Sequence, residues 1–340
     1  MFALYKIKKI LNDPGMLDPN RDWMYLDEQN KSSVLIYELE LGKKILAINS
    51  SSPFNTTEYF KAISNMELPS FDTYGKKLPM FLHGQPHFDA RKQLNIFYKN
   101  IELSLLGFID EKTVEYFQGS NDEKYIEPIK FTSIYLKKIF TTIIAQDLQC
   151  HEDEVPELPG EIFYMIPGKN KLQEYEVKIH KLNRFIEDRL SSLGRDSGDA
   201  WMFLSITIMG TDTLLSSLLY GMVYADQFNH DYSRASYAAN PVTVIGRIIN
   251  EALSFDDLDL TIGQQVYVAP GIAYAHQTVS PEKESLDSMA FGHGAHLCPG
   301  RKIAQIIIEN YLKVWFNLAD KDNCKDIAFK KDFINRPYIV

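Results

Sequence analysis

The stretch Phe291-Gly-His-Gly-Ala-His-Leu-Cys-Pro-Gly-Arg-Lys-Ile-Ala304 constrains this chain most, because it sets one cysteine in a glycine-rich loop that leads directly into an apolar helix. The thiolate is the form of cysteine that binds metal, and the unpaired N–H groups of a helix N-terminus stabilise it. Gly292, Gly294 and Gly300 allow the backbone to pass close to a large flat group. We expect the helix to begin near Pro299, since proline suits the first helical position.

The loop resembles the haem-ligand loop of the cytochrome P-450 family, Phe-x-x-Gly-x-x-x-Cys-x-Gly-x-x-x-Ala, at all five fixed positions. The resemblance implies haem b, with Cys298 as the iron ligand and with Phe291 and Gly300 beside the cofactor. It also implies a mainly α fold with a small β sheet, in which residues 1–340 form one triangular domain and haem lies between two long helices. The alternative is a buried structural cysteine beside an ordinary turn.

Charge and cysteine content exclude several other classes of protein. The formal charge of −9 argues against nucleic acid as a partner, because phosphate binding needs a clustered basic surface. Three cysteines without close spacing form neither a disulfide framework nor a Cys-x-x-Cys metal site, which favours a reducing cytoplasm.

No segment of the sequence is expected to enter a membrane. Residues 1–17 contain neither a long apolar run nor a small-residue cleavage site, so we expect neither a signal peptide nor an anchor. The long uncharged run from Ala200 to Met222 contains Asp212 at its middle. This carboxylate favours a helix buried inside a protein over a membrane span.

Helical periodicity dominates the chain and predicts helices near residues 87–100, 124–147, 170–193, 198–226 and 300–318. Residues 33–50 are predicted to form a β-hairpin, with strands at 34–40 and 45–48. A second strand pair is predicted at 258–261 and 265–269, with Gly263 in the turn.

Haem carries two propionates, so its binding requires several cationic or donor groups. His87 and Arg91 are four residues apart and project from one face of a helix that Pro86 opens. By resemblance, this pair, His296 and Arg247 contact the propionates. The alternative for His296 is a solvated histidine in the loop. The alternative for His87 and Arg91 is a His/Arg pair of the kind that is common on solvated helices.

Met209-Gly-Thr-Asp-Thr213, inside the buried helix, resembles the family's [Ala/Gly]-Gly-x-[Asp/Glu]-Thr motif. An acid next to an alcohol relays protons to dioxygen, so that its O–O bond breaks with loss of water. The resemblance therefore makes Asp212 and Thr213 the catalytic pair, and Gly210 leaves room for dioxygen. Met209 replaces the usual small residue and narrows the pocket. The alternative for Thr213 is a hydroxyl bonded back to its own helix.

The family's Glu-x-x-Arg pair is absent where it is expected, because Arg234 and Tyr237 occupy those places when the chain is aligned from Pro241. Asp231 and Arg234 either replace that pair, if a short insertion follows them, or belong to a polar connection. The segment between His276 and Phe291 is also shorter than is usual.

The resemblance implies a monooxygenase that oxidises a small organic molecule, with dioxygen and with electrons from a separate ferredoxin or flavodoxin. The expected substrate is a secondary metabolite, either free or presented by a carrier protein. The alternatives are a haem-thiolate enzyme of another type (peroxygenase, coupling or rearrangement) and a degenerate haem-binding scaffold. Arg301 and Lys302 either help to dock an acidic donor or are ordinary solvated charges.

Overall fold

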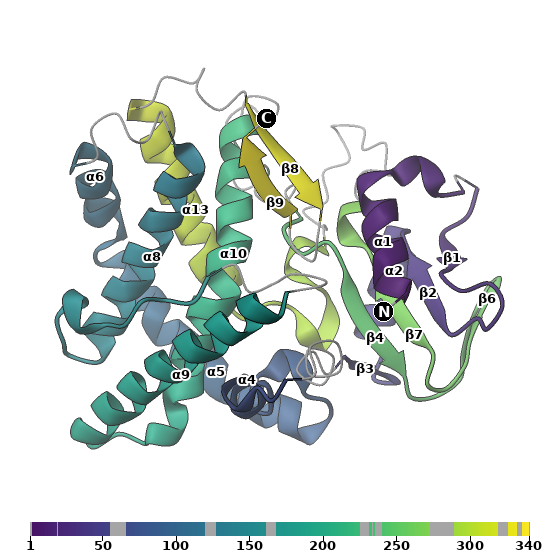
Figure 1. Cartoon of the computed structure of the whole chain (residues 1–340), viewed down its shortest axis with the longest axis horizontal. Coiled ribbons are helices and arrows are strands. Elements are labelled where there is room, and N and C mark those ends of the chain that lie inside the picture. Colours follow the sequence, from purple (N-terminus) through teal and green to yellow (C-terminus); the bar gives the residue numbers. More distant parts are fainter. Residues whose placement is uncertain are drawn as a thin grey trace.

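The computed structural model shows a large helical part beside a smaller part built on a β sheet (Figure 1). The residues that it describes are 2–18, 20–54, 66–119, 127–160, 168–224, 231–232, 234, 240–272, 289–318, 326–331 and 335–339. The expected composition, mainly α with a small sheet, is confirmed.

The helices occur where the sequence periodicity placed them, and the described residues form four more, at 2–12, 39–47, 69–75 and 109–119. Their bounds are α1 Phe2–Asn12, α2 Leu39–Ala47, α4 Pro69–Gly75, α5 Gln85–Leu106, α6 Ile109–Gly119, α8 Pro128–Asp147, α9 Lys169–Ser192, α10 Ala200–Tyr224 and α13 Arg301–Leu318. Pro86 lies in the first turn of α5, and α13 begins two residues after Pro299.

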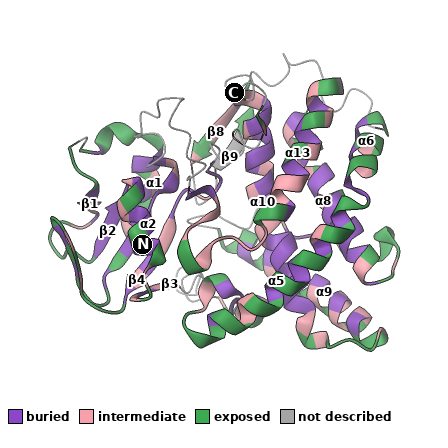
Figure 2. Cartoon of the chain, turned by 180° about the vertical axis from the view of Figure 1, so that it is seen from behind, coloured by how far each residue is buried: buried purple, intermediate pink, exposed green. Residues whose placement is uncertain are grey.

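Helix α10 runs through the middle of the helical part, where α8, α9 and α13 pack against it (Figure 2). It is long and apolar enough to cross a membrane, but 78% of its most apolar window is buried inside the protein. Most of its residues are therefore buried whichever way they point. The exceptions include Met209, Thr213, Tyr220 and Tyr224, which repeat at helical spacing along one face.

The sheet has five strands in the order β1-β2-β7-β4-β3. Their bounds are β1 Trp23–Tyr25, β2 Ser33–Ile36, β3 Ser51–Pro53, β4 Ile245–Ile249 and β7 Gln265–Val268. Strand β7 pairs parallel with β2 and antiparallel with β4, so strands distant in sequence meet at its centre. Two separate hairpins consist of β5 Leu253–Phe255 with β6 Leu258–Leu260, and β8 Ile327–Lys331 with β9 Asn335–Ile339.

The predicted hairpin at residues 33–50 is wrong beyond its first strand. Residues 33–36 do form a strand, but α2 occupies the positions expected for the turn and the second strand. The carboxylate of Glu38 accepts hydrogen bonds from the backbone N–H groups of Glu40 and Leu41, and so caps the helix. Leu39, Leu46 and their apolar neighbours are buried at helical spacing, which overrides the local strand signal.

The second predicted strand pair is also wrong in its pairing, although both segments are strands. Strand β6 pairs with β5, whereas β7 enters the large sheet between β2 and β4. Gly263 has φ +80°, so it supplies the expected turn between two strands that do not pair with each other.

Gly210 allows α8 and α10 to approach closely. A Cβ atom on this glycine would lie 2.7 Å from Cζ of Phe140 on α8. The small residue is therefore required for helix packing, whatever else it does.

We predict that Gly210→Ala lowers the free energy of unfolding by about 1–2 kcal/mol, because overpacking costs more than the gain in helix propensity. Urea unfolding measures this change. Gly119→Ala, at the end of α6 with nothing within 4 Å, is the matched control. Full stability of Gly210→Ala, or no rescue by an added Phe140→Leu, would contradict the packing argument.

Candidate haem site

The cysteine loop connects a short 3-10 turn, Met289–Phe291, to α13. Gly292 and Gly294 have φ values of +76° and +65°, which most other residues adopt only with strain. The backbone N–H of Cys298 donates to the carbonyl of Phe291 over 2.7 Å and closes the loop. The conformation that brings the cysteine to the start of α13 is therefore fixed by local sequence.

The loop is wedged against α2 and α5. A Cβ atom on Gly294 would lie 2.8 Å from Cα of Ala47, at the end of α2. A Cβ atom on Gly300 would lie 3.4 Å from Cε2 of Tyr98 on α5 and 3.9 Å from the sulfur of Cys298. The position of the cysteine is thus set by both parts of the protein.

Burial is the largest influence on the pKa of the Cys298 thiol. The residue keeps part of its surface exposed, but burial raises the pKa of its thiol. The backbone N–H of Gly300 and the charges of Arg91 and Arg301 act in the opposite direction. These groups favour the negative sulfur that a metal would bind.

The predicted propionate-binding residues come together from three distant segments. The rings of His87 on α5 and His296 in the cysteine loop have centroids 4.2 Å apart. The charge of Arg91 and that of Arg247, on β4, lower the pKa of both histidines, although burial is the larger cause. The two arginines and the two histidines therefore surround one small region.

This cluster has no carboxylate partner among the described residues. Arg247 is only 5% exposed, and within the described part of the chain its side chain donates one hydrogen bond, to the carbonyl of Gly246. Burial lowers the pKa of Arg247 to about 10. Nε2 of His87 is buried without a hydrogen-bond partner. Because buried cations and donors are costly unless paired, the cluster fits a dianionic group such as the two propionates of haem.

Sequence reasoning missed two residues of this region. His83 is exposed near the start of α5, and its charge also lowers the pKa values of His87 and His296. Tyr98 lies seven residues after Arg91 on the same face of α5 and reaches the cysteine loop. The helical spacing from Arg91 was the available signal for Tyr98. The position of His83, four residues before His87, was a weaker one.

The oxygen-activation motif lies on α10. Asp212 is 6% exposed, and Thr213 lies on the partly exposed face of α10 that also carries Met209. The hydroxyl of Thr213 donates to the carbonyl of Met209 over 2.7 Å, with the carbonyl of Gly210 at 3.2 Å. The back-bonded arrangement, the alternative for this residue, is therefore present in the ligand-free chain.

Asp231 and Arg234 were the expected substitutes for the Glu-x-x-Arg pair. The Asp231 carboxylate accepts a hydrogen bond from the backbone N–H of Arg234 at 3.0 Å. The rest of that connection, and the short segment from residue 276 to 288, lie outside the described residues.

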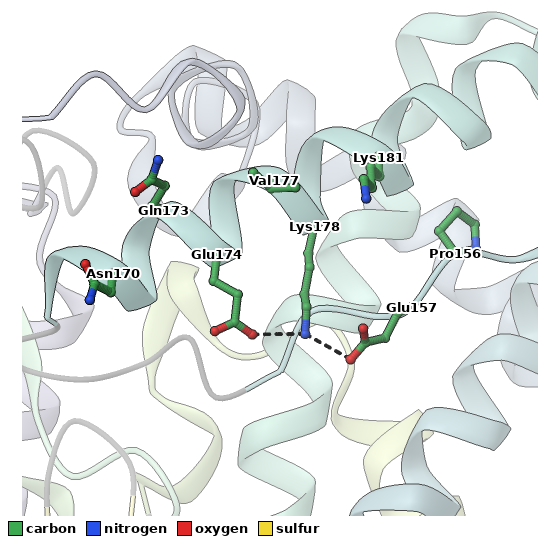
Figure 3. Close-up of a pocket in the computed structure, with 8 residues that line it drawn as sticks. All are labelled: Pro156, Glu157, Asn170, Gln173, Glu174, Val177, Lys178 and Lys181. Carbon is green, nitrogen blue, oxygen red and sulfur yellow. Dashed lines mark hydrogen bonds and ion pairs between the residues drawn. The ribbon is translucent and has the colours of Figure 1, made fainter.

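A surface pocket of about 680 Å³ lies elsewhere, along the outer side of α9 (Figure 3). Lys178 extends from α9 between two of the lining glutamates, with its Nζ 2.9 Å from Glu157 and 3.1 Å from Glu174. None of the predicted site residues lines this pocket, and its charges neutralise one another. It is therefore distinct from the cysteine site.

The pH dependence of stability tests the burial of His296 in this cluster of basic residues. Burial and neighbouring cations lower the pKa of His296 to about 3, against about 6.5 in the unfolded chain. The unfolded state therefore binds the proton first, and the stability held above pH 6.5 is lost as the pH falls towards 3.

We predict that acidifying the ligand-free chain from pH 7 to pH 5 costs on the order of 1 kcal/mol through His296, after allowance for its partial exposure. His296→Gln should reduce this loss in urea unfolding at the two pH values. His180→Gln, at an exposed position on α9, is the control. The same pH dependence in wild type and His296→Gln would contradict the burial of a neutral histidine.

The solved structures that are similar to this chain share the same fold. No protein-family model and no curated protein sequence matches the chain. Among solved structures, the P450 RauA bound to a biosynthetic intermediate of aurachin RE has TM-score 0.69 and 13% identity, covering 97% of this chain and 96% of that one. The tirandamycin C-bound monooxygenase TamI has TM-score 0.68 and 17% identity, covering 90% and 88%.

A third similar structure is P450BioI in complex with an acyl carrier protein that carries hexadec-9Z-enoic acid. It has TM-score 0.64 and 14% identity, with coverage of 89% of this chain and 90% of that one. The similarity spans both the helical part and the sheet, although few residues are identical. The chain therefore has the cytochrome P450 fold.

Proposed function

We propose that the chain is a haem-thiolate monooxygenase that oxidises a small organic molecule of secondary metabolism. The observation that carries this proposal is Cys298, presented at the start of α13 beside a cluster of basic side chains to which the described residues offer no carboxylate partner. The fold supports it, because cytochromes P450 bind haem through a cysteine thiolate.

In this proposal Cys298 ligates the iron of haem b, and His87, Arg91, Arg247 and His296 hold the propionates. When bound, the haem supplies the redox chemistry that activates dioxygen, and thiolate ligation favours O–O cleavage. The burial of His87 and Arg247, together with the partial burial of Arg91 and His296, would exclude water from the propionates and strengthen the electrostatic attraction. Removing any one of them therefore weakens cofactor retention.

Asp212 and Thr213 deliver protons in this proposal. The Thr213 hydroxyl already donates its one proton to Met209, so its oxygen is left to accept a hydrogen bond from water or substrate. Rotation of the hydroxyl away from the carbonyl frees that proton for transfer. Asp212, one residue before it, replaces the proton.

The back-bond of Thr213 also favours a second candidate, a haem-thiolate enzyme of non-oxygenase type. A hydroxyl that never leaves the Met209 carbonyl relays no proton, and a peroxide-driven enzyme has less need of the relay. The two candidates differ in their dependence on reductant.

We predict that Thr213→Ala retains haem but diverts reductant to peroxide or water, so that product formed per electron pair falls several-fold. Product and reductant consumption are measured together. Thr211→Ala is the matched control, since the Thr211 hydroxyl makes a similar back-bond, to Thr207 over 2.6 Å, but is buried on another side of α10. Equal coupling in Thr213→Ala and wild type would remove the threonine from the mechanism and favour the second candidate.

Electrons come from a separate donor protein in this proposal. Arg301 and Lys302 are exposed at the start of α13, next to the cysteine loop, and Lys302 pairs with Glu102 of α5 at 3.8 Å. Lys92 and Lys99 lie on the exposed face of α5, alternating with Ile96, which is 60% exposed. A mixed basic and apolar surface fits an acidic ferredoxin or flavodoxin.

We predict that Lys302→Glu raises the KM for an acidic donor several-fold and weakens its dependence on ionic strength, because a steering charge is reversed. Reduction by dithionite should be unchanged. Lys181→Glu, beside the pocket on α9, is the control. An unaltered KM would make Lys302 an ordinary solvated charge.

The substrate belongs to the same proposal. The similar structure with an acyl carrier protein supports a substrate that is either free or presented by a carrier. The mostly apolar residues of α10 and of the turn at 242–245 supply a hydrophobic contact surface. A cytoplasmic location completes the proposal, in keeping with the reduced cysteines.

A further inference from the structure

Tyr98 lies on the face of α5 that is turned towards the cysteine loop. His87, Arg91, Leu94 and Tyr98 follow one another at helical spacing, and Tyr98 is only 7% exposed. His87 and Arg91 belong to the cluster of basic residues described above. Tyr98 has a different neighbour, the loop around the sulfur of Cys298.

The edge of the Tyr98 ring and the sulfur both lie against Gly300. A Cβ atom at that position would contact Cε2 of the ring at 3.4 Å and the sulfur at 3.9 Å. The absence of a side chain at Gly300 thus allows the aromatic edge to approach the sulfur. The ring edge carries partial positive charge and favours a negative neighbour.

The hydroxyl of Tyr98 is anchored on α10. It lies 2.8 Å from Oγ of Ser205, and Ser205 donates its own proton to the carbonyl of Met202 over 2.5 Å. Because a serine hydroxyl has one proton, Tyr98 is the donor in the pair. The phenol therefore cannot donate to the sulfur, and the ring is held in place between α10 and the cysteine loop.

We propose that Tyr98 is a positioning residue for the ligand sulfur: its anchored ring shields Cys298 from water and fixes the loop against α5. This inference rests on the proposed ligation of haem by Cys298. Hydrogen bonds and solvent access at a ligating sulfur set how strongly it donates electrons to the metal. Tyr98 thus sets the electronic character of the ligand without contacting substrate.

The shielding is tested first in the full-length chain before haem is added, by the rate at which iodoacetamide alkylates Cys298. Peptide mass spectrometry separates this cysteine from Cys150, which is partly exposed and serves as an internal reference. Tyr98→Leu should accelerate alkylation of Cys298 by about tenfold, equivalent to about 1.4 kcal/mol of lost protection. Tyr98→Phe, which keeps the ring, should change it far less.

Phe97→Leu is the matched control, because Phe97 is the neighbouring buried ring of α5 but packs on Phe203, at 4.8 Å, away from the loop. It loses the same aromatic volume without opening the sulfur. Equal acceleration in Phe97→Leu and Tyr98→Leu, or none in Tyr98→Leu, would overturn the inference.

The reduction potential of the haem-loaded protein is the second measurement. Tyr98→Leu should raise it, because water admitted to the sulfur weakens electron donation, and Ser205→Ala should produce a smaller shift in the same direction. An unchanged potential in Tyr98→Leu would overturn the electronic role. Failure of the chain to bind haem would instead sink the proposed function, and the alkylation result would still decide whether Tyr98 shields the sulfur.

Discussion

Close packing around α10 determines how the rest of the chain is arranged. Two glycines on this helix give neighbouring helices room to approach: Gly210 faces Phe140 of α8, and Gly221 faces Leu312 of α13. A Cβ atom at Gly221 would lie 2.6 Å from a Leu312 methyl group. Helix α13 begins at the cysteine loop, so the packing that seats α13 on α10 also places Cys298 relative to Asp212 and Thr213. Because α8, α9 and α13 pack around α10, its apolar residues are buried inside the protein.

The second constraint is electrostatic. Arg247, His87 and His296 are held near one another without a carboxylate among the described residues, which costs free energy in the ligand-free chain. A protein that only needed to fold would gain by replacing them with apolar residues. Their retention in a cluster beside the cysteine loop is explained if a dianionic cofactor compensates them. The pKa values of the two histidines are lowered first by burial and second by the charges of the neighbouring arginines.

Local chemistry made parts of this structure predictable. The spacing of Gly294, Cys298 and Gly300 predicted the loop, because positive φ values and close contacts admit few other residues. Long amphipathic or apolar periods likewise predicted α5, α8, α9, α10 and α13. The segment from Leu39 to Ala47 was mispredicted, because its apolar residues suit a short strand as well as a helix, and the cap at Glu38 decides between them.

The sequence did not indicate which strands pair with each other, because β7 lies between β2 and β4, two strands that are distant from each other in the chain. For Tyr98, the helical spacing from Arg91 indicated the face of α5 on which it lies, but only the folded chain brings its ring to Gly300.

The most direct test of the account is the carbon monoxide difference spectrum of the dithionite-reduced, haem-loaded protein, recorded for wild type and Cys298→Ala. The account predicts the strongly red-shifted Soret band of a thiolate–carbon monoxide complex in wild type and its loss in the variant. An unshifted band in wild type, or a red-shifted band that survives in Cys298→Ala, would contradict ligation by Cys298.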